Sequence, residues 1–378
     1  MARPRPLDVL VTDAQSRAGV AGIRALGAAG RRVVALAEER GGPGLWSRHA
    51  ALRAVGPSPA EGRAFVERIG ELAVEHGPLV VLPGQEQALD PLCEHGDMLP
   101  DEAILPYPSL ASVRTLRHKP SLEALVGPAG LAVPETLAEG PAGALAADPP
   151  QAPCVVKSPG LSRALTVARV VETREELLAL LGRLPEDEPV LIQERATGPL
   201  IGLALVLDRD GEVVASFQQE ATLLWPLAAG GSRRATSVAP DDALVQAAAR
   251  LLRAAGFWGF AQMQFLTARR GPAIIDVNPR LYGSLPLATA AGINLPAVWH
   301  AVALGEPVGD TSYRAGVSYR WLEGELAAAA KGAWRELLRR PPAPRSGAMW
   351  AADDPLPSTL LALGSAWRRT GRKLAIAR

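Results

Sequence analysis

The chain has 378 residues, of which 48% are hydrophobic and 21% are charged, and its formal net charge is +1. This length is enough for about two or three domains, and the composition is typical of a soluble globular protein. The small net charge gives no reason to expect a nucleic-acid or membrane partner. Cys93 and Cys154, the only cysteines, are too few for a disulfide framework or a structural zinc site.

The N-terminal sequence MARPRPLDVLVTD lacks the apolar run of a signal peptide. The most apolar stretch of the chain, 285–304, is interrupted by Asn294, Pro296 and His300. These polar and helix-breaking residues make it a poor candidate for a membrane span. We therefore predict a cytoplasmic protein without a transmembrane segment.

The first elements alternate between strand and helix. The pattern predicts strands at 8–13, 31–38 and 78–84 and helices at 17–30 and 60–77. This βαβ opening is typical of a Rossmann-like domain, which we assign to residues 1–108. The turn TDAQSRAG has one glycine where a dinucleotide-binding fingerprint needs three, so an NAD site is weakly supported. Ser16 and Arg17 of this turn are instead suited to an anionic substrate, since such sheets bind ligands at the carboxyl end of the first strand.

The rest of the chain has a different organisation. Two helical segments meet near Lys119, and strands at 152–158, 165–171 and 189–195 enclose a helix at 173–184. A hairpin with the turn DRDG, a helix at 243–259 and a second hairpin (260–266 and 273–278) come next. Beyond residue 311, the pattern predicts helices at 321–340 and 356–374, separated by a proline-rich linker at 341–357.

The sequence IIDVNPRLYGS at 274–284 places polar residues inside an apolar strand. Because side chains alternate across a strand, Asp276 and Asn278 are expected on one face, and Ile275 and Val277 on the other. If the second hairpin pairs symmetrically about Arg270, Gln264 lies opposite Asp276. Burying such polar groups without partners would cost about 2–7 kcal/mol each, so a partner or a ligand is expected.

The order of these residues resembles the ATP-grasp superfamily. Lys119 follows a helical segment, Lys157 ends a buried strand, and Gln264 precedes the motif D-V-N-P-R at 276–280. The likeness is strongest to the carbamoyl-phosphate-synthase-like branch of carboxylate–amine ligases, and it covers roughly residues 7–305. It implies an α/β (α+β) architecture with a Rossmann-like pre-ATP-grasp domain at 1–108. A two-lobed ATP-grasp domain would follow at 109–310 (small lobe about 131–195), and then a helical C-terminal extension at 311–378.

The resemblance also implies an activity and a site. The protein would be an ATP-dependent ligase that activates a carboxylate as an acyl-phosphate for attack by an amine, giving ADP and phosphate. Lys119 and Lys157 would contact the phosphates of ATP, and Gln193 and Glu194 would lie beside the adenine. Mg²⁺, with Mn²⁺ as an alternative, would be held by Gln264, Asp276 and Asn278. Arg280 would be the catalytic residue that clamps the γ-phosphate or the acyl-phosphate.

Other interpretations remain open for single residues. Asp276 could belong to a salt-bridged strand end, and Lys157 could be an ordinary strand-end lysine. Only four of the 40 basic residues are lysines, which favours a functional role for Lys157. The sequence GGSRRATS at 230–237 is predicted to be a flexible basic loop on the substrate side, where Arg233 and Arg234 could hold a carboxylate.

The sequence departs from the family pattern at several positions. His118 stands where the family usually has Asp, and the segment KSPGLSRA has one glycine, Gly160, with Ser158, Ser162 and Arg163 as further donors. Pro199 and Leu200 replace an acidic residue often found there. A second hypothesis is therefore a nucleotide-binding ATP-grasp relic that regulates or scaffolds without ligating. A Rossmann oxidoreductase is disfavoured by the missing glycine fingerprint. The expected partners are small-molecule carboxylates and amines, and a homo-oligomer is left open.

Overall fold

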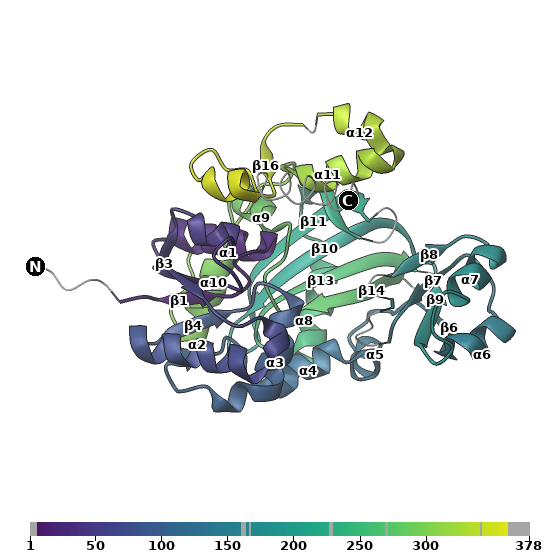
Figure 1. Ribbon diagram of the computed structural model, residues 1–378, viewed down its shortest axis with the longest axis horizontal. Helices are drawn as coiled ribbons and strands as arrows, with labels where there is room; N and C mark the ends of the chain where they lie inside the picture. Colours follow the sequence, from purple (N-terminus) through teal and green to yellow (C-terminus); the bar gives the residue numbers. More distant parts are fainter. Residues whose placement is uncertain are drawn as a thin grey trace, which may run out of the picture.

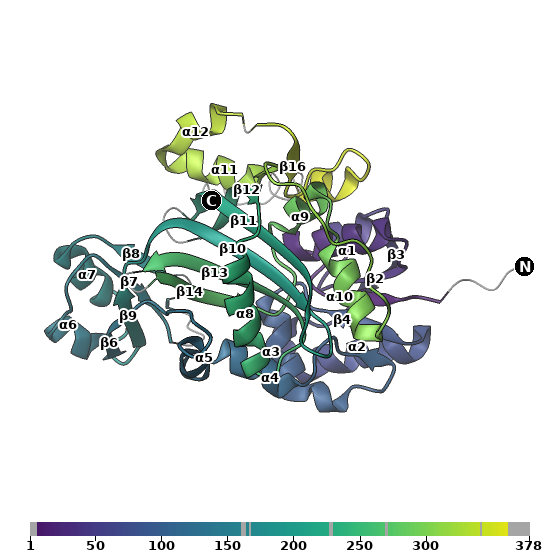
Figure 2. The ribbon, with the colours of Figure 1, turned by 180° about the vertical axis from the view of Figure 1, so that it is seen from behind.

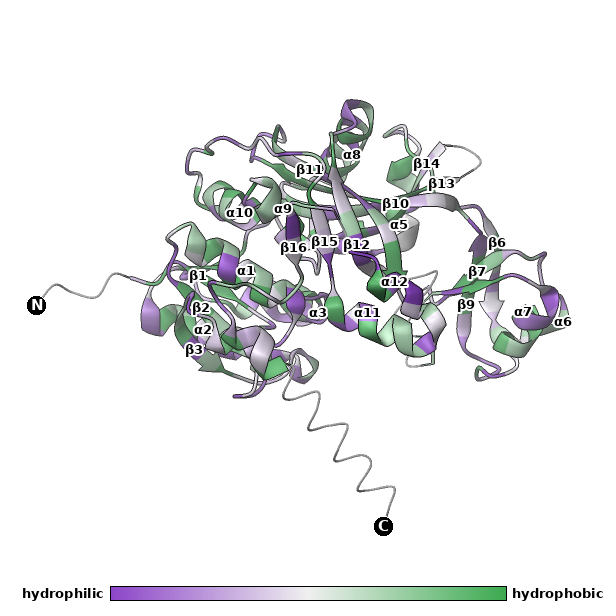
Figure 3. Ribbon diagram, turned by 90° about the horizontal axis from the view of Figure 1, so that it is seen from above, coloured by the Kyte–Doolittle hydropathy of each residue, from purple (hydrophilic) through white to green (hydrophobic). Residues whose placement is uncertain are grey.

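The computed structural model describes residues 6–159, 164–165, 168–226, 230–268, 271–340 and 342–361. The molecule is elongated, with an N-terminal domain at one end, a large central sheet, and a small lobe at the other end (Figure 1). Viewed from above, the small lobe projects away from the remaining structure (Figure 3). The expected α/β architecture, with a Rossmann-like domain in front of two lobes, is confirmed.

The N-terminal domain is built on a five-stranded parallel sheet of order β3-β2-β1-β4-β5. The central β1 pairs in register with β2 and β4 on its two sides, which confirms the predicted βαβ opening. The edge strand β3 was not predicted, because its residues are mostly exposed or half-buried and include Arg53. The elements are β1 (Val9–Val11), α1 (Arg17–Ala28), β2 (Val33–Ala37), β3 (Ala50–Val55), α2 (Arg63–His76), β4 (Leu79–Leu82), α3 (Glu86–His95) and β5 (Ala103–Ile104).

Two short helices connect this domain to the small lobe. They are α4 (Leu110–Arg117) and α5 (Lys119–Val126), and they meet at His118, whose backbone is extended. The small lobe contains a four-stranded sheet of order β6-β9-β7-β8. One face packs against its two helices through a core that includes Cys154, Val156, Leu177 and Ile192. The elements are β6 (Thr136–Pro141), α6 (Ala142–Ala147), β7 (Cys154–Lys157), β8 (Arg169–Val171), α7 (Arg174–Leu181) and β9 (Pro189–Glu194).

The large sheet has seven strands in the order β14-β13-β10-β11-β12-β15-β16. Helix α8 covers its back face (Figure 2), and Ala248, Leu251 and Leu252 of α8 belong to the same core as Leu203 and Leu205 of β10. Helices α9 and α10 contact α1 of the N-terminal domain. The elements are β10 (Thr197–Leu207), β11 (Val213–Trp225), β12 (Gly231–Val238), α8 (Asp242–Ala254), β13 (Gly259–Ala268), β14 (Gly271–Asn278), α9 (Leu285–Ala291), α10 (Leu295–Leu304), β15 (Ser318–Arg320) and β16 (Arg345–Gly347).

The C-terminal segment differs from its predicted form. Besides helices α11 (Leu322–Ala328) and α12 (Trp334–Leu338), it contributes β15 and β16, which extend the large sheet. The prediction of a linker at 341–357 was wrong, because this part contains β16 and the buried Asp354. Residues 362–374 of the last predicted helix lie outside the described residues.

Asp354 anchors the C-terminal segment to the N-terminal domain. Its carboxylate lies 2.8 Å from Nε of Arg24 and accepts hydrogen bonds from Ser47 Oγ (2.7 Å) and Arg48 N (2.9 Å). These donors hold the pKa of Asp354 below its usual value although burial opposes them. The C-terminal segment therefore joins the N-terminal domain to the edge of the large sheet.

No single helix of the described part of the chain is long and apolar enough to cross a membrane. The bent pair α9 and α10, whose axes differ by 94°, meets that criterion only when its two helices are taken together.

Candidate active site

Two cavities meet over the large sheet. The interlobe cavity, of about 560 Å³, lies between the small lobe and the large sheet, and its lining includes Lys157, Gln193 and Glu194. The N-domain cavity, of about 320 Å³, lies between the N-terminal domain and the large sheet, and its lining includes Arg17 and Arg280. Both cavities are lined by Leu200, Gly231, Gln264 and Asp276. Two of the three predicted metal ligands therefore lie where the cavities join.

The second hairpin brings Gln264 opposite Asp276, as predicted. Its register shifts by one residue between Gln264 and Phe265, so that Phe265 pairs with Ile274. Ile275 is the extra residue of this bulge and lines the interlobe cavity, whereas Ile274 and Val277 belong to the core. The prediction that Ile275 shares the buried face with Val277 was wrong, because a bulge interrupts the strict alternation of side chains.

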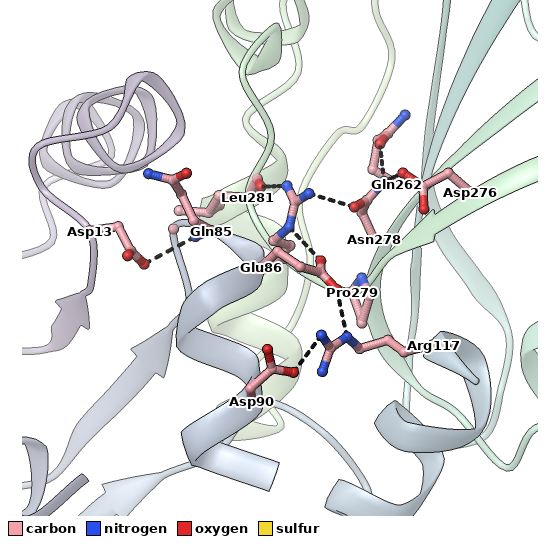
Figure 4. Close-up of polar contacts among 12 residues, drawn as sticks. Asp13, Gln85, Glu86, Asp90, Arg117, Gln262, Asp276, Asn278, Pro279 and Leu281 are labelled. Atoms are coloured by element: carbon pink, nitrogen blue, oxygen red, sulfur yellow. Dashed lines mark hydrogen bonds and ion pairs between the residues drawn. The ribbon is translucent and has the colours of Figure 1, made fainter. Parts of the chain in front are cut away.

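Asp276 and Asn278 share one face of β14, and both line the N-domain cavity. Asn278 Nδ2 donates hydrogen bonds to Asp276 Oδ2 (2.7 Å) and to Gln262 Oε1 (3.1 Å), and Asn278 Oδ1 accepts one from Arg280 Nη2 (2.5 Å) (Figure 4). The sequence analysis missed Gln262, although it stands two residues before Gln264 and pairs with Asn278 across the hairpin. These contacts fix the orientation of Asp276.

The carboxyl group of Asp276 opens onto the cavities but is surrounded by protein. Burial raises its pKa above the ordinary value, while the hydrogen bond from Asn278 and the charges of Arg280 and Lys157 oppose the rise. The ionised form is thus poorly stabilised by the protein alone. A cation bound in the cavity would stabilise it.

Lys157 stands at the end of β7, where alternation determines its surroundings. Cys154 and Val156 point into the core of the small lobe, whereas Val155 and Lys157 line the interlobe cavity. Its positive charge acts on Asp276, which belongs to the opposite lobe. Lys157 is therefore placed to contact an anionic group held between the lobes.

Gln193 and Glu194 end β9 and also line the interlobe cavity. Gln193 Nε2 donates to the carbonyl of Pro134 at 3.2 Å, and Glu194 Oε1 accepts from Glu135 N at 3.0 Å. Both side chains thus bind the segment that enters β6. Arg195 and Ala196, which also line the cavity, follow the end of β9. Gln193 and Glu194 belong to the wall of this cavity, and their place beside the adenine stays a prediction.

Other predicted positions are less fully described. Lys119 is the first residue of α5, but its side chain lies outside the described part of the structure. Its role therefore stays a prediction. Gly160, Ser162 and Arg163 of the predicted phosphate loop are also outside the described residues.

Arg280 is held between two domains. Its Nε lies 3.0 Å from Glu86 Oε2 of α3, and its Nη1 donates to the carbonyl of Leu281 at 2.9 Å. Glu86 Oε1 also accepts from Arg117 Nε at 2.6 Å, and Arg117 pairs with Asp90 at 2.6 Å (Figure 4). Glu86 and Arg117 escaped the sequence analysis because no local pattern links them to Arg280.

The N-domain cavity is also bounded by two loops that are tied together. Asp13, which follows β1, has the unusual positive φ of 54°. Its Oδ2 accepts hydrogen bonds from Thr12 Oγ1 (2.5 Å) and from Gln85 N (3.0 Å), the residue before α3 (Figure 4). Burial raises the pKa of Asp13. This contact fixes the loop after β1 against the loop after β4, where Rossmann-type sheets bind ligands.

Ser16 and Arg17 line the N-domain cavity, as the sequence suggested. Ser16 Oγ caps α1 by accepting from Gly19 N at 2.9 Å. The guanidinium of Arg17 lies 3.4 Å from the centre of the Trp321 ring, and its Nη1 donates to Tyr319 Oη at 3.3 Å. The stacking fixes the plane of the guanidinium beside the cavity.

The predicted substrate role of Arg233 and Arg234 is contradicted. Residues 231–238 form β12, and a bulge at Arg233 turns both arginines toward the C-terminal helices. Arg233 pairs with Glu336, and Arg234 donates from Nε and Nη2 to the two carboxylate oxygens of the buried Glu325. Consecutive arginines after two glycines resembled a solvated loop, but their partners lie about a hundred residues later, at separations of 103 and 91 residues.

Comparisons with known proteins agree with this architecture. A family model described as ATP-grasp in the biosynthetic pathway with Ter operon matches residues 206–325. No curated protein matches the chain significantly. The structure is similar to a biotin carboxylase–β-γ-ATP complex from Campylobacter jejuni, with a TM-score of 0.63 and 16% identity over 83% of this chain and 74% of that one.

Two further solved structures have comparable similarity. One is the biotin carboxylase domain of the Hydrogenobacter thermophilus 2-oxoglutarate carboxylase, in complex with MgADP, ADP and bicarbonate (TM-score 0.60, 18% identity, 84% of this chain and 74% of that chain). The other is N5-carboxyaminoimidazole ribonucleotide synthetase from Thermus thermophilus (TM-score 0.59, 18% identity, 81% of each chain).

A Rossmann-like domain followed by two lobes that enclose a cavity is thus the fold that this chain shares with these solved structures. Residues 206–325, which form most of the large sheet and helices α8 to α10, match the ATP-grasp family model.

Proposed function

We propose that the protein is an ATP-dependent ligase that phosphorylates a carboxylate and joins the resulting acyl-phosphate to an amine. The observation that carries this proposal is the junction of two cavities at Gln264 and Asp276. Phosphoryl transfer requires the nucleotide and its acceptor to meet at one point in a fixed geometry. The interlobe cavity would hold ATP, and the N-domain cavity would hold the acid.

The donor set at the junction is suited to Mg²⁺, which prefers hard oxygen ligands. Asp276 offers a carboxylate, and Gln264 offers an amide oxygen on the same face. Asn278 would offer its oxygen only after releasing Arg280 Nη2, which now occupies it. A metal that arrives with ATP would neutralise charge on the transferred phosphoryl group.

The side chains around the junction have complementary roles in this scheme. Lys157 would hold the phosphates from the small lobe, and the end of β9 at Gln193 and Glu194 would border the adenine. Lys119 is the second candidate for the phosphates. Arg280, once released from Asn278, would neutralise negative charge first on the transferred phosphoryl group and then on the acyl-phosphate.

The bond changes balance in two steps. In the first, an oxygen of the acid attacks the γ-phosphorus of ATP, and the bond to the β-phosphate oxygen breaks to release ADP. In the second, the nitrogen lone pair of the amine attacks the acyl carbon, phosphate leaves, and the amine loses a proton. The amide product therefore forms at the expense of one ATP.

Hydroxylamine trapping tests this proposal without knowledge of the amine. Purified protein is mixed with MgATP and a panel of acids, and ADP and the acyl hydroxamate are measured together. Acid-dependent formation of both products is expected. Nucleotide binding without ADP release for any acid would contradict a ligase.

That second outcome would favour the alternative, a nucleotide-binding relic with a regulatory or scaffolding role. One observation supports this alternative. Arg280 is engaged by Glu86, Asn278 and the carbonyl of Leu281, so it is not presented freely to a phosphate. The trapping experiment distinguishes the two hypotheses because only a ligase forms the hydroxamate.

A further inference from the structure

The floor of the N-domain cavity is one row of residues across four strands of the large sheet. Asp276 pairs with Gln264, Gln264 with Gly202, and Gly202 with Gln219. Residues paired directly across antiparallel strands point to the same face, and all four line this cavity. Neighbouring strands are about 4.8 Å apart, so the Cα atoms of Asp276 and Gln219 are separated by roughly 14 Å.

Gly202 has no side chain, and the Gln219 side chain leans into part of the space above it. A Cβ atom at position 202 would lie 3.1 Å from Gln219 Cγ and 3.3 Å from Gln219 Nε2. A larger side chain there would push the Gln219 side chain aside and narrow the space between the two ends of the row. The backbone of Gly202 does not have a positive φ, so glycine is not needed for the strand itself.

Gln219 ends the row with an unused acceptor. Its side chain is 4% exposed, and Nε2 donates to Ser284 Oγ at 2.8 Å. Its Oε1 is buried and receives no hydrogen bond from the described part of the protein. Burying an unpaired acceptor costs free energy, which a ligand with an N–H or O–H group would offset.

Arg17 supplies the available cation of this cavity. Arg280 is paired with Glu86, whereas no carboxylate of the described residues forms an ion pair with Arg17. Trp321 covers one face of its guanidinium and Tyr319 Oη accepts from Nη1, which leaves further N–H groups for an anion. The reacting carboxylate must lie near Asp276, so Arg17 is suited to a second anionic group.

The remaining lining favours a polar ligand of modest size. Side-chain amides dominate it, namely Gln85, Gln87, Gln219, Gln262, Gln264 and Asn278. Its volume of about 320 Å³ is near the lower end of the usual range for ligand sites, roughly 300–1,000 Å³. Such a lining offers hydrogen bonds and little apolar surface.

We propose that the N-domain cavity binds a small polar acid that carries a second anionic group and an N–H or O–H donor. Its reacting carboxylate lies over Gln264 and Asp276, its chain passes over Gly202, the donor contacts Gln219 Oε1, and the second anion contacts Arg17. This inference rests on the proposed function, because it assigns the acid of that reaction. The second anion is a carboxylate or a phosphate-type group.

The test compares acids that differ in one feature. Butyrate has a single anion, succinate adds a second carboxylate, aspartate adds an amino donor, and 3-phosphonopropanoate replaces the second carboxylate by a phosphonate. Longer homologues of each are included. The measurements are binding of each acid beside a non-hydrolysable ATP analogue, and formation of the hydroxamate with MgATP and hydroxylamine.

We expect the acids with two anionic groups to be preferred over the single-anion acids by about tenfold or more in kcat/KM. Arg17→Gln should remove this preference. Gly202→Val should weaken binding of every acid while the affinity for the ATP analogue is kept, because Gly202 does not line the interlobe cavity. Gly202→Ala is the milder variant if the valine variant does not fold.

Two matched controls lie outside both cavities. Arg53→Gln removes another arginine stacked on a tryptophan, with Cζ 5.0 Å from the Trp46 ring, and Ser216→Val adds bulk to the strand beside Gly202. Both should behave as wild type. Equal use of acids with one and two anions, a preference that survives Arg17→Gln, or no binding of any acid would overturn the inference. Failure to bind the ATP analogue would instead overturn the proposed nucleotide site.

Discussion

Arg280 Nε lies 3.0 Å from Oε2 of Glu86, so the residue expected to act on phosphate is held by the N-terminal domain. The same carboxylate binds Arg117, which binds Asp90 in turn. Since Arg280 also donates to Asn278, this ion pair connects helix α3 to the face of β14 that carries Asp276. Glu86 is therefore a positioning residue for Arg280.

Glu86→Gln should lower kcat by about tenfold and leave the KM for ATP nearly unchanged, because Arg280 would lose its orientation while the interlobe cavity is untouched. Steady-state kinetics with MgATP and an active acid measure the two constants. Glu71→Gln, which breaks the exposed pair with Arg68, is the control. A rise in the KM for ATP with unchanged kcat would contradict a positioning role.

Asp276→Asn should abolish ATP turnover while the fold is kept. The substitution retains the size of the side chain but removes the anionic ligand that faces Gln264. The ligand-free variant should be as stable as the wild type or more stable, because burial already disfavours the charged form of Asp276. Turnover and thermal unfolding are measured across a Mg²⁺ titration. Full activity of the variant would refute the metal-site assignment.

The raised pKa of Asp276 has a predictable effect on stability. In the folded protein the group holds its proton to a higher pH than in the unfolded chain, whose reference value is 3.8. Between these two pKa values the folded state binds more protons, so the contribution of Asp276 to stability falls as pH rises through this window. Above the folded-state pKa, the loss of stability that is due to the ionised Asp276 has reached its full value.

Chemical denaturation of the ligand-free protein at a series of pH values measures this contribution. The free energy of unfolding of Asp276→Asn relative to wild type should increase from acid toward neutral pH. A pH-independent difference would show that the pKa of Asp276 is the same in both states. With Mg²⁺ and nucleotide bound, the trend should weaken, because the cation stabilises the carboxylate.

Lys157→Ala should weaken ATP binding by more than tenfold, which corresponds to about 1.4 kcal/mol. The lysine lines the interlobe cavity, and its charge already acts on Asp276 across it. Calorimetric titration with a non-hydrolysable analogue gives the affinity. Lys331→Ala removes one of the three other lysines from an exposed position and serves as the control. Equal affinities of the two variants would exclude phosphate contact by Lys157.

Glu325→Gln should destabilise the protein by about 3–5 kcal/mol, because it leaves buried arginines without their shared anion. Glu325 is 0% exposed and pairs with Arg233, Arg234 and Arg320. Urea unfolding measures the loss. Glu323→Gln changes an exposed carboxylate on the same helix and should cost little. Similar stabilities of both variants would mean that the buried pairs contribute nothing.

The parts of the site that follow from local pattern were predictable. Alternation and hairpin symmetry predicted that Gln264 faces Asp276 and that Asn278 shares their side of the sheet. The bulge at Ile275 was not predictable, because the position of an extra residue in one strand depends on the pairing with the neighbouring strand. The sequence also located Lys157 at a strand end, because β-branched neighbours and a following proline define that end well.

Long-range charge pairs could not be predicted. Glu86 and Arg280 are 194 residues apart, and Arg234 and Glu325 are 91 residues apart. No spacing rule connects such positions, and a solvated arginine and a buried one look alike in a single sequence. For the same reason the proline-rich stretch before Asp354 resembled a linker, since its partners Arg24 and Ser47 belong to the first domain.

The anchoring of the C-terminal segment limits how the molecule can open. The segment is fastened to the N-terminal domain at Asp354 and to the large sheet at Glu325. It thus connects the two parts of the protein between which the N-domain cavity lies. Among the described residues, the C-terminal segment does not anchor the small lobe in this way. The chain enters the small lobe after Ala132, which pairs with Ala273 of the large sheet, and leaves it at Arg195–Ala196. We therefore expect the N-terminal domain and the large sheet to keep their relative position. If nucleotide binds between the lobes, the small lobe alone should tilt when it enters and leaves.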